Sequence, residues 1–177
     1  MVSFRKTSSV YFFTATNLNW IKVLEEDKHK TILINSLNFL SENKRVRVLG
    51  FVIMPNHIHV IWQILEPNIN SDVQRDFLKY TSQQIKWNLV NTDSPLLDDI
   101  RVNAKDRRYQ VWERNPLWFE LDNTATFLQK LNYIHNNPCQ EKWLLAEKPE
   151  DYKHSSASFY LLNSKEYDFL MRYDEIL

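Results

Sequence analysis

Residues 52–62 have the sequence Val-Ile-Met-Pro-Asn-His-Ile-His-Val-Ile-Trp, and this stretch decides the fold prediction. It joins two nearly continuous apolar runs, residues 45–54 and 57–65, which Pro55 and Asn56 separate. Apolar runs of this length with a short break between them predict two neighbouring strands joined by a short turn. We therefore expect a pair of adjacent strands near the middle of the chain.

The segments on either side of this pair predict an α+β fold. Residues 10–16 are rich in β-branched and aromatic side chains and predict a first strand, and residues 109–113 predict a short fourth strand. Apolar side chains recur at helical spacing in residues 25–43, 72–90 and 124–137. The order strand, helix, strand, strand, helix, strand predicts a ferredoxin-like antiparallel sheet with helices packed on one face and the other face free for a ligand.

Length and composition favour one globular domain. The 177 residues include 44% hydrophobic and 14% aromatic residues, which is typical of a chain that buries one core. We expect a single domain over residues 1–177, with a C-terminal extension over about residues 145–177 made of short helical or extended pieces. No apolar run approaches the roughly 18 residues that would cross a bilayer, so no membrane partner is expected.

The counts of cysteine and glycine bear on the compartment and the cofactor. The lone Cys139 cannot form an internal disulfide, and the first residues lack the apolar stretch of a secretory signal, so a cytoplasmic location is the simplest expectation. Gly50 is the only glycine in the chain. Phosphate-binding loops need several backbone positions without a Cβ atom, so we expect no nucleotide cofactor.

The net charge of zero conceals separate charged zones. By segment it is +4 over residues 1–60, −3 over 61–100, +3 over 101–114 and −4 over 115–177. The positive zones suit a polyanion such as DNA, although solvated charged loops give the same pattern. Trp112 is expected in the core. The candidate DNA-binding residues are Arg45, Arg47, Lys105, Arg107, Arg108, Arg114 and Trp118.

His57 and His59 are candidate metal ligands. Side chains alternate between the two faces of a strand, so both imidazoles should point to one face while Ile58, Val60 and Trp62 point to the other. Imidazole is a common metal ligand, but an isolated His-x-His is also typical of two histidines solvated on the open face of a half-buried sheet. The residues alone leave both interpretations open.

Tyr133 and Asn137 lie four residues apart on the predicted third helix, so a hydroxyl and an amide share one helix face. Taken singly, Asn137 is also typical of a C-terminal cap, and Tyr133 is also typical of a packing residue on an amphipathic helix. His135 lies about 200° around the helix from Tyr133, so we expect it to be structural.

Two motifs resemble those of the single-tyrosine HUH transposases. Residues 52–62 are similar to the histidine motif of this family. Residues 133–138, Tyr-Ile-His-Asn-Asn-Pro, are similar to the tyrosine helix of its REP-associated tyrosine transposases and insertion sequence 200-like enzymes. With further similar stretches the resemblance covers about residues 10–160. Residues 115–121, where relatives have a His-Pro-containing turn, and residues 139–143 depart from the family pattern.

This resemblance implies an activity and a site. By position, His57 and His59 would be paired metal ligands, Asn137 the third ligand and Tyr133 the nucleophile. The implied activity is a transposase that cleaves and rejoins single-stranded DNA near hairpins through a transient 5′-phosphotyrosine, with Mg²⁺ or Mn²⁺ as cofactor. The implied partner is single-stranded or hairpin DNA, and the family includes both homodimers and monomers. The alternative is a relative that binds palindromic repeat DNA without catalysis.

Overall fold

The structure is a computed structural model and describes residues 9–176. Its strands are β1 (Val10–Thr16), β2 (Val46–Met54), β3 (His57–Ile64) and β4 (Leu117–Glu120). Its α-helices are α1 (Asp27–Glu42), α2 (Asn70–Asn91), α3 (Leu96–Asp99), α4 (Thr124–Asn136) and α5 (Ala157–Leu162). Short 3₁₀ helices span Leu18–Trp20, Asn137–Cys139, Pro149–Asp151 and Tyr173–Glu175.

The four strands form one antiparallel sheet in the order β2-β3-β1-β4. β2 and β3 are joined by the two residues Pro55 and Asn56, as the break in the apolar sequence predicts. α1 connects β1 to β2, and α2 lies between β3 and β4 along the chain. This is the split βαβ arrangement of the ferredoxin-like fold, so the predicted fold class is confirmed.

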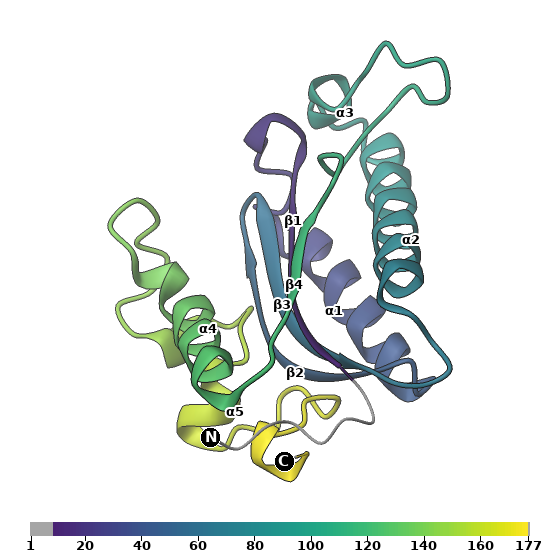
Figure 1. The fold of residues 1–177 in the computed structure, drawn as a ribbon. Coiled ribbons are helices and arrows are strands. Elements are labelled where there is room, and N and C mark those ends of the chain that lie inside the picture. Colours follow the sequence, from purple (N-terminus) through teal and green to yellow (C-terminus); the bar gives the residue numbers. More distant parts are fainter. Residues whose placement is uncertain (1–8, 177) are drawn as a thin grey trace.

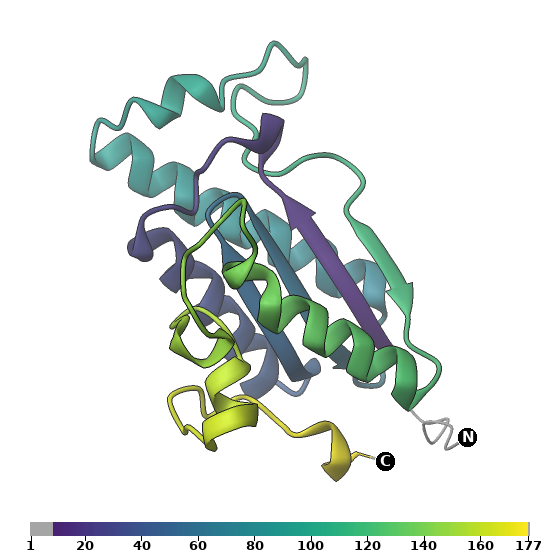
Figure 2. The same cartoon turned by 90° about the vertical axis from the view of Figure 1, so that its left-hand side faces the viewer.

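Helices cover both faces of the sheet. Figure 1 shows the sheet between α1 and α2 on one side and α4 on the other, and Figure 2 shows α4 lying across the second face. Phe13 and Trp62 belong to the core on the side of α1 and α2, whereas Phe12 and Ile61 belong to the core under α4. The face that we expected to be free for a ligand is therefore partly covered by α4.

The prediction of a fourth strand at residues 109–113 is wrong, because the fourth strand, β4, begins four residues further along the chain, at Leu117. Trp112 forms only an isolated bridge with Asn17, which lies just beyond the end of β1. The side chain of Trp112 is buried, as expected, and its indole Nε1 donates to Thr81 Oγ1 of α2 at 3.0 Å. The apolar pattern of this segment therefore reflects burial against α2, while the half-exposed residues 117–120 pair with β1.

The C-terminal part of the chain covers the edge of β2. The amide of Ile53 donates to the carbonyl of His154, and the amide of Ser156 donates to the carbonyl of Phe51, both at 2.9 Å. Residues 154–156 thus act as a short extra strand beside β2. This pairing satisfies backbone groups that an edge strand leaves open.

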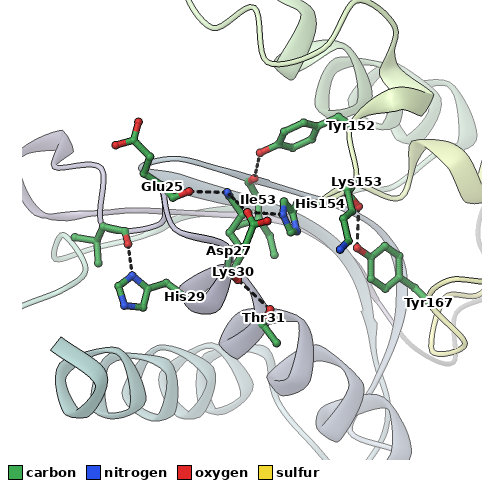
Figure 3. A network of polar contacts seen from close by, with 11 residues as sticks. Glu25, Asp27, His29, Lys30, Thr31, Ile53, Tyr152, Lys153, His154 and Tyr167 are labelled. Atoms are coloured by element: carbon green, nitrogen blue, oxygen red, sulfur yellow. Dashed lines mark hydrogen bonds and ion pairs between the residues drawn. The ribbon is translucent and has the colours of Figure 1, made fainter. Parts of the chain in front are cut away.

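A polar network attaches the same segment to α1 (Figure 3). Asp27 Oδ1 accepts from Lys30 Nζ and from His154 Nε2, each at 2.9 Å. The hydrogen bond from Lys30 is the main cause that lowers the pKa of Asp27, and His154 adds to it. The hydroxyls of Tyr152 and Tyr167 donate to backbone carbonyls nearby, at 2.8 and 2.7 Å. The C-terminal segment is therefore fixed to both the sheet and α1.

Candidate active site

His57 and His59 lie side by side near the turn between β2 and β3. In register, His57 pairs with Thr16 and His59 with Thr14 of β1. Both imidazoles are buried, with 6% exposure each, and their ring centres are 4.8 Å apart. Their neighbour Ile58 belongs to the core on the side of α1 and α2, so the histidines point to the opposite face, as the strand alternation predicts.

Neighbouring side chains orient each imidazole. The amide nitrogen of Asn56 donates to the carbonyl of Trp20 at 3.1 Å, so its Oδ1 accepts from Nδ1 of His57 at 2.7 Å. Nδ1 of His57 therefore carries the proton, and Nε2 keeps its lone pair. Nδ1 of His59 lies 2.7 Å from the hydroxyl of Thr14. A partner on one ring nitrogen that leaves the other available is the usual arrangement around a metal-binding histidine.

Both histidines are neutral at pH 7. Burial lowers the pKa of His57 to about 4, and the charge of Lys142 adds to this effect. Burial lowers the pKa of His59 to about 3, with further contributions from His57, Lys130 and Lys142. Neutral imidazole is the form that binds a metal ion, so these two side chains need release no proton to act as ligands.

α4 places Tyr133 and Asn137 above the two histidines. Its N-terminus is capped by Asn123, whose Oδ1 accepts from the Thr126 amide at 2.9 Å. The ring of Tyr133 lies 5.4 Å from that of His59 and is 44% exposed. Nδ2 of Asn137 lies 3.4 Å from Nε2 of His57. The C-terminal end of α4 and its capping residue thus present an exposed tyrosine and a buried amide to the same pair of imidazoles.

Close packing fixes α4 on the sheet. A Cβ atom at Gly50 of β2 would lie 2.7 Å from Cδ1 of Leu131 and 3.4 Å from Cδ1 of Ile134, so two side chains of α4 pack directly against the only glycine of the chain. His135 is buried, and its Nε2 lies 2.8 Å from the hydroxyl of Ser156. His135 is therefore structural, as expected from its angle to Tyr133.

Lys130 is a member of the site that the sequence analysis missed. Its ammonium lies 5.7 Å from the ring centre of Tyr133, 5.4 Å from that of Phe12 and 5.3 Å from that of Phe119. Cations within about 6 Å of aromatic ring centres are attracted to their faces. The available signal was the spacing of three residues between Lys130 and Tyr133, which places both on one helix face.

The donor set fits a divalent metal ion. Residues 9–176 contain no group of three or more His, Cys, Asp or Glu side chains placed to hold a metal, so the candidate set is mixed and includes an amide. Nε2 of His59 and Oδ1 of Asn137 are buried and have no hydrogen-bond partner within the same residues. Buried polar atoms are almost always partnered. Two unpartnered ligand atoms beside His57 Nε2 are what a bound cation would explain.

Two of the candidate DNA-binding residues lie far from the histidines. Arg47 pairs in register with Gln63, six residues along β3 from His57, which is about 20 Å at the usual rise of a strand. Arg45 forms an ion pair with Asp76 at 2.9 Å, and Nη1 of Arg47 donates to Oε1 of Gln63 at 2.9 Å. The structure therefore places both arginines at the far end of the sheet.

The basic residues between α3 and β4 are exposed. The candidate DNA-binding group in this segment consists of Lys105, Arg107, Arg108 and Arg114, and Arg101 is the fifth basic residue there. Arg107 is ion-paired with Asp106, and the guanidinium of Arg108 lies 5.5 Å from the ring centre of Tyr109. The group is separate from Tyr133, because its segment lies between α2 and the end of β1.

Trp118 is exposed but faces away from the histidines. Its side chain is 49% exposed and packs edge-on against Tyr11, with ring centres 5.7 Å apart. In register it pairs with Phe13, whose side chain belongs to the core under α1 and α2. Residues directly opposite each other in neighbouring strands share a face. Trp118 therefore lies on the sheet face opposite to His59.

Comparison with known proteins gives relatives in both sequence and structure. No family model matches the chain. An uncharacterized protein of Haemophilus influenzae is 33% identical over 101 residues, which are 53% of this chain and 55% of that protein. The chain thus aligns with about half of the length of this relative.

Two solved structures to which the chain is similar are described as transposases. The structure of a REP-associated tyrosine transposase bound to a REP hairpin matches with a TM-score of 0.63 and 18% identity, over 89% of this chain and 83% of that one. A candidate transposase from Deinococcus radiodurans matches with a TM-score of 0.51 and 13% identity, over 77% of this chain and 97% of that one. These matches show that the chain has the fold of the HUH transposases, and they support its resemblance to the single-tyrosine members of that family.

Proposed function

We propose that this protein is a metal-dependent transposase that cleaves and rejoins single-stranded DNA near hairpins through a 5′-phosphotyrosine. The observation that carries the proposal is the meeting of four side chains, His57, His59, Tyr133 and Asn137, from two segments about 75 residues apart. Each alone has an ordinary structural explanation. Their common location brings two buried and unpartnered ligand atoms, Nε2 of His59 and Oδ1 of Asn137, beside His57, which supports a metal site.

In this proposal His57, His59 and Asn137 hold Mg²⁺ or Mn²⁺. Two neutral imidazoles and one amide oxygen would leave such an ion open to phosphate oxygens and water, unlike the ion of a closed structural zinc site. A bound divalent cation would neutralise the negative charge that grows on the scissile phosphate. Thr14 and Asn56 contact Nδ1 of His59 and of His57, respectively, which leaves Nε2 of each ring to face the proposed metal site.

Tyr133 is the proposed nucleophile. Its hydroxyl oxygen forms a bond to the scissile phosphorus, the bond from phosphorus to the 3′ oxygen breaks, and the phenolic proton is lost as the 3′ end leaves as a hydroxyl. The ammonium of Lys130 beside the ring favours the negative charge that develops on the phenolic oxygen. The phosphotyrosine conserves the energy of the broken phosphodiester bond. A second 3′ hydroxyl can therefore attack it, release the tyrosine and join two strands without a nucleotide triphosphate.

The proposed partner is hairpin DNA with unpaired flanks. The solved REP-associated tyrosine transposase to which this chain is similar is bound to a REP hairpin. All four candidate residues come from one chain here, so the proposal needs no second subunit to complete the site. None of the helices in the part of the chain that the structure describes is long and apolar enough to cross a membrane.

We further propose that residues 1–177 form one domain whose segment from about residue 145 belongs to the same folded unit. The backbone pairing of residues 154–156 with β2 and the contact between His154 and Asp27 support this extent.

The test is covalent capture of DNA. Purified protein is incubated with a labelled hairpin with unpaired flanks, taken from the DNA beside its own gene, and separated under denaturing conditions. We expect a protein–DNA band with Mn²⁺, and none with EDTA or with Tyr133→Phe. Tyr80→Phe, at another exposed tyrosine, is the matched control and should leave the band intact. Tight binding of the same DNA without any band would instead favour a binder of palindromic repeats that has lost catalysis.

A further inference from the structure

A groove lies on the side of the sheet that faces away from Tyr133. It has a volume of about 810 Å³ and runs between α2 and residues 106–116. α2 and α4 are on opposite sides of the sheet (Figure 1). Trp112 lines the groove, and its hydrogen bond to Thr81 holds this segment against α2. The catalytic steps proposed above make no use of the groove.

One wall of the groove is a basic stripe on α2. Arg75, Lys79 and Lys86 line it, and Ser82 and Gln83 lie between them. Spacings of four and seven residues place these side chains on one face of a helix. The stripe extends from Arg75 to Lys86, eleven positions further along α2, which corresponds to about 16 Å along the helix axis.

The positive charge of the groove is only partly neutralised. Arg75 is ion-paired with Asp72 and Asp76 of its own helix. Arg107, on the opposite wall, is similarly paired with Asp106.

Three further cations line the same groove, and no ion-pair partner lies within 4 Å of any of them in residues 9–176. They are Lys79, Lys86 and Arg114. The remaining acidic group, Glu113, accepts a hydrogen bond from the Asn19 amide at 2.7 Å. Three exposed cations on two fixed walls favour a polyanionic ligand.

The size and surroundings of the groove favour a single strand over a duplex. A volume of about 810 Å³ is in the range of pockets that hold one small molecule, about 300–1,000 Å³, so it accommodates a few nucleotides. Trp87 is 65% exposed and lines an adjoining hollow together with Gln83 and Lys86, which also line the groove. A basic groove with an exposed aromatic ring beside it is the usual combination for unpaired nucleic acid, whose bases stack on such rings.

Trp112, which lines the groove, is connected to the candidate active site by a short chain of contacts. Trp112 is bridged to Asn17, and the amide of Asn17 donates to the carbonyl of Asn56 at 2.8 Å. Asn56 in turn contacts His57. A DNA strand that leaves the groove beside Trp112 would therefore be near the end of the sheet where the two histidines lie.

We propose that this groove binds an unpaired DNA segment that flanks the cleaved position, on the sheet face opposite to Tyr133. The inference rests on the proposed function for the identity of the ligand as DNA. It adds a second binding site, with Lys79, Lys86 and Arg114 as the phosphate-binding residues and Trp87 as the stacking residue.

The test compares the double variant Lys79→Gln/Lys86→Gln with the control Lys148→Gln/Lys165→Gln, which removes two exposed lysines elsewhere. Fluorescence anisotropy measures binding of two probes, a hairpin with unpaired flanks and the same hairpin with blunt ends, over a series of salt concentrations. For the flanked hairpin we expect at least a tenfold rise in Kd. Each phosphate contact to a single strand contributes about 0.7 to the slope of log K against log salt, so the slope should fall by about 1.4.

The outcomes separate this inference from the proposed chemistry. The control variant should bind both probes like the wild type, and the double variant should bind the blunt hairpin like the wild type. An unchanged Kd and slope for the flanked hairpin would overturn the groove as a DNA site. An equal loss for both probes would overturn its assignment to a single strand. If the wild-type protein forms no adduct, the proposed chemistry fails, but the binding measurements still decide whether the groove binds DNA.

Discussion

The buried Nε2 atom of His135 lies 2.8 Å from the hydroxyl oxygen of Ser156, and the same hydroxyl accepts from the amide of Phe51 at 2.9 Å. His135 lies two residues after Tyr133 and two before Asn137. α4 is therefore anchored to β2 at a point midway between the two residues that it brings to the histidines. Burial lowers the pKa of His135 to about 4, so this contact is one between neutral groups at pH 7.

Replacement of Ser156 tests this anchor. Ser156→Ala leaves the buried imidazole of His135 without its partner, and a buried polar group left in this state costs about 1–3 kcal/mol. We expect the free energy of unfolding, measured by urea denaturation, to fall by that amount. Ser71→Ala, at an exposed position, is the control and should change it by less than about 0.5 kcal/mol. If the two variants are equally stable, the contact does not hold α4.

Gly50 should be coupled to Leu131. Gly50→Ala puts a Cβ atom 2.7 Å from Cδ1 of Leu131, and overpacking of this kind costs about 1–3 kcal/mol. The double variant Gly50→Ala/Leu131→Ala removes the clash, so its loss of unfolding free energy should be smaller than the sum of the two single losses. Denaturation of all four proteins gives the coupling energy. Additive losses would show that α4 has room to move away from β2.

Metal binding should depend on the amide oxygen of Asn137. Asn137→Asp supplies a carboxylate at the same position and should bind Mn²⁺ at least as tightly as the wild type. Asn137→Leu, of similar size, should lose the rise in Tm that Mn²⁺ gives. Thermal unfolding with and without Mn²⁺ measures the rise in Tm for each variant. Tyr133→Phe should show the same rise in Tm as the wild type. Equal stabilisation of the leucine variant would exclude Asn137 as a ligand.

Stability should fall in mild acid in the absence of metal. The pKa values of His57, His59 and His135 are lowered by burial to about 4, 3 and 4, from 6.5. Below about pH 6.5 the unfolded chain takes up protons that the folded chain does not, so the free energy of unfolding falls as the pH is lowered towards about 4. Each histidine contributes roughly 1.4 kcal/mol per pH unit.

Urea denaturation in EDTA between pH 7 and 5 measures this effect. His59→Gln should remove the share of one histidine from the slope. A free energy of unfolding that is independent of pH over this range would contradict the burial of neutral imidazoles at the site.

Lys130 should affect the rate of DNA cleavage more than DNA binding. A charge about 6 Å from the phenol is worth roughly 1–3 kcal/mol in a partly buried site, so Lys130→Met should slow adduct formation about 10- to 100-fold. Lys130→Arg keeps the charge and should retain most of the rate. Single-turnover rates at saturating DNA separate this effect from affinity. Similar rates for the two variants would show that the charge has no part in the reaction.

Local patterns in the sequence predict most of the sheet. They also predict that His57 and His59 share one face of a strand and that Tyr133 and Asn137 share one face of a helix. The apolar runs around Pro55 and Asn56 predict β2 and β3, and strand alternation predicts that His57 and His59 share a face. The spacing of Tyr133 and Asn137 likewise follows from helix geometry. These are periodicities of the backbone, so they can be seen in a single sequence.

Features that depend on contacts between distant segments were not predicted. Residues 109–113 have a strand-like pattern because Val111 and Trp112 are buried, but they lie beyond the end of β1. The position of α4 across the second face depends on Gly50, and the aromatic surroundings of Lys130 come from β1 and β4. Such contacts join different elements of the fold, and no local pattern encodes them.

The most direct test of the central claim is to locate the DNA link on the protein. The adduct formed with Mn²⁺ is digested with trypsin and nuclease, and the modified peptide is identified by mass spectrometry. We predict a nucleotide linked by its 5′ phosphate to residues 131–142, in which Tyr133 is the only tyrosine. A link to any other of the eight tyrosines, or none in a protein that binds the hairpin tightly, would contradict the account.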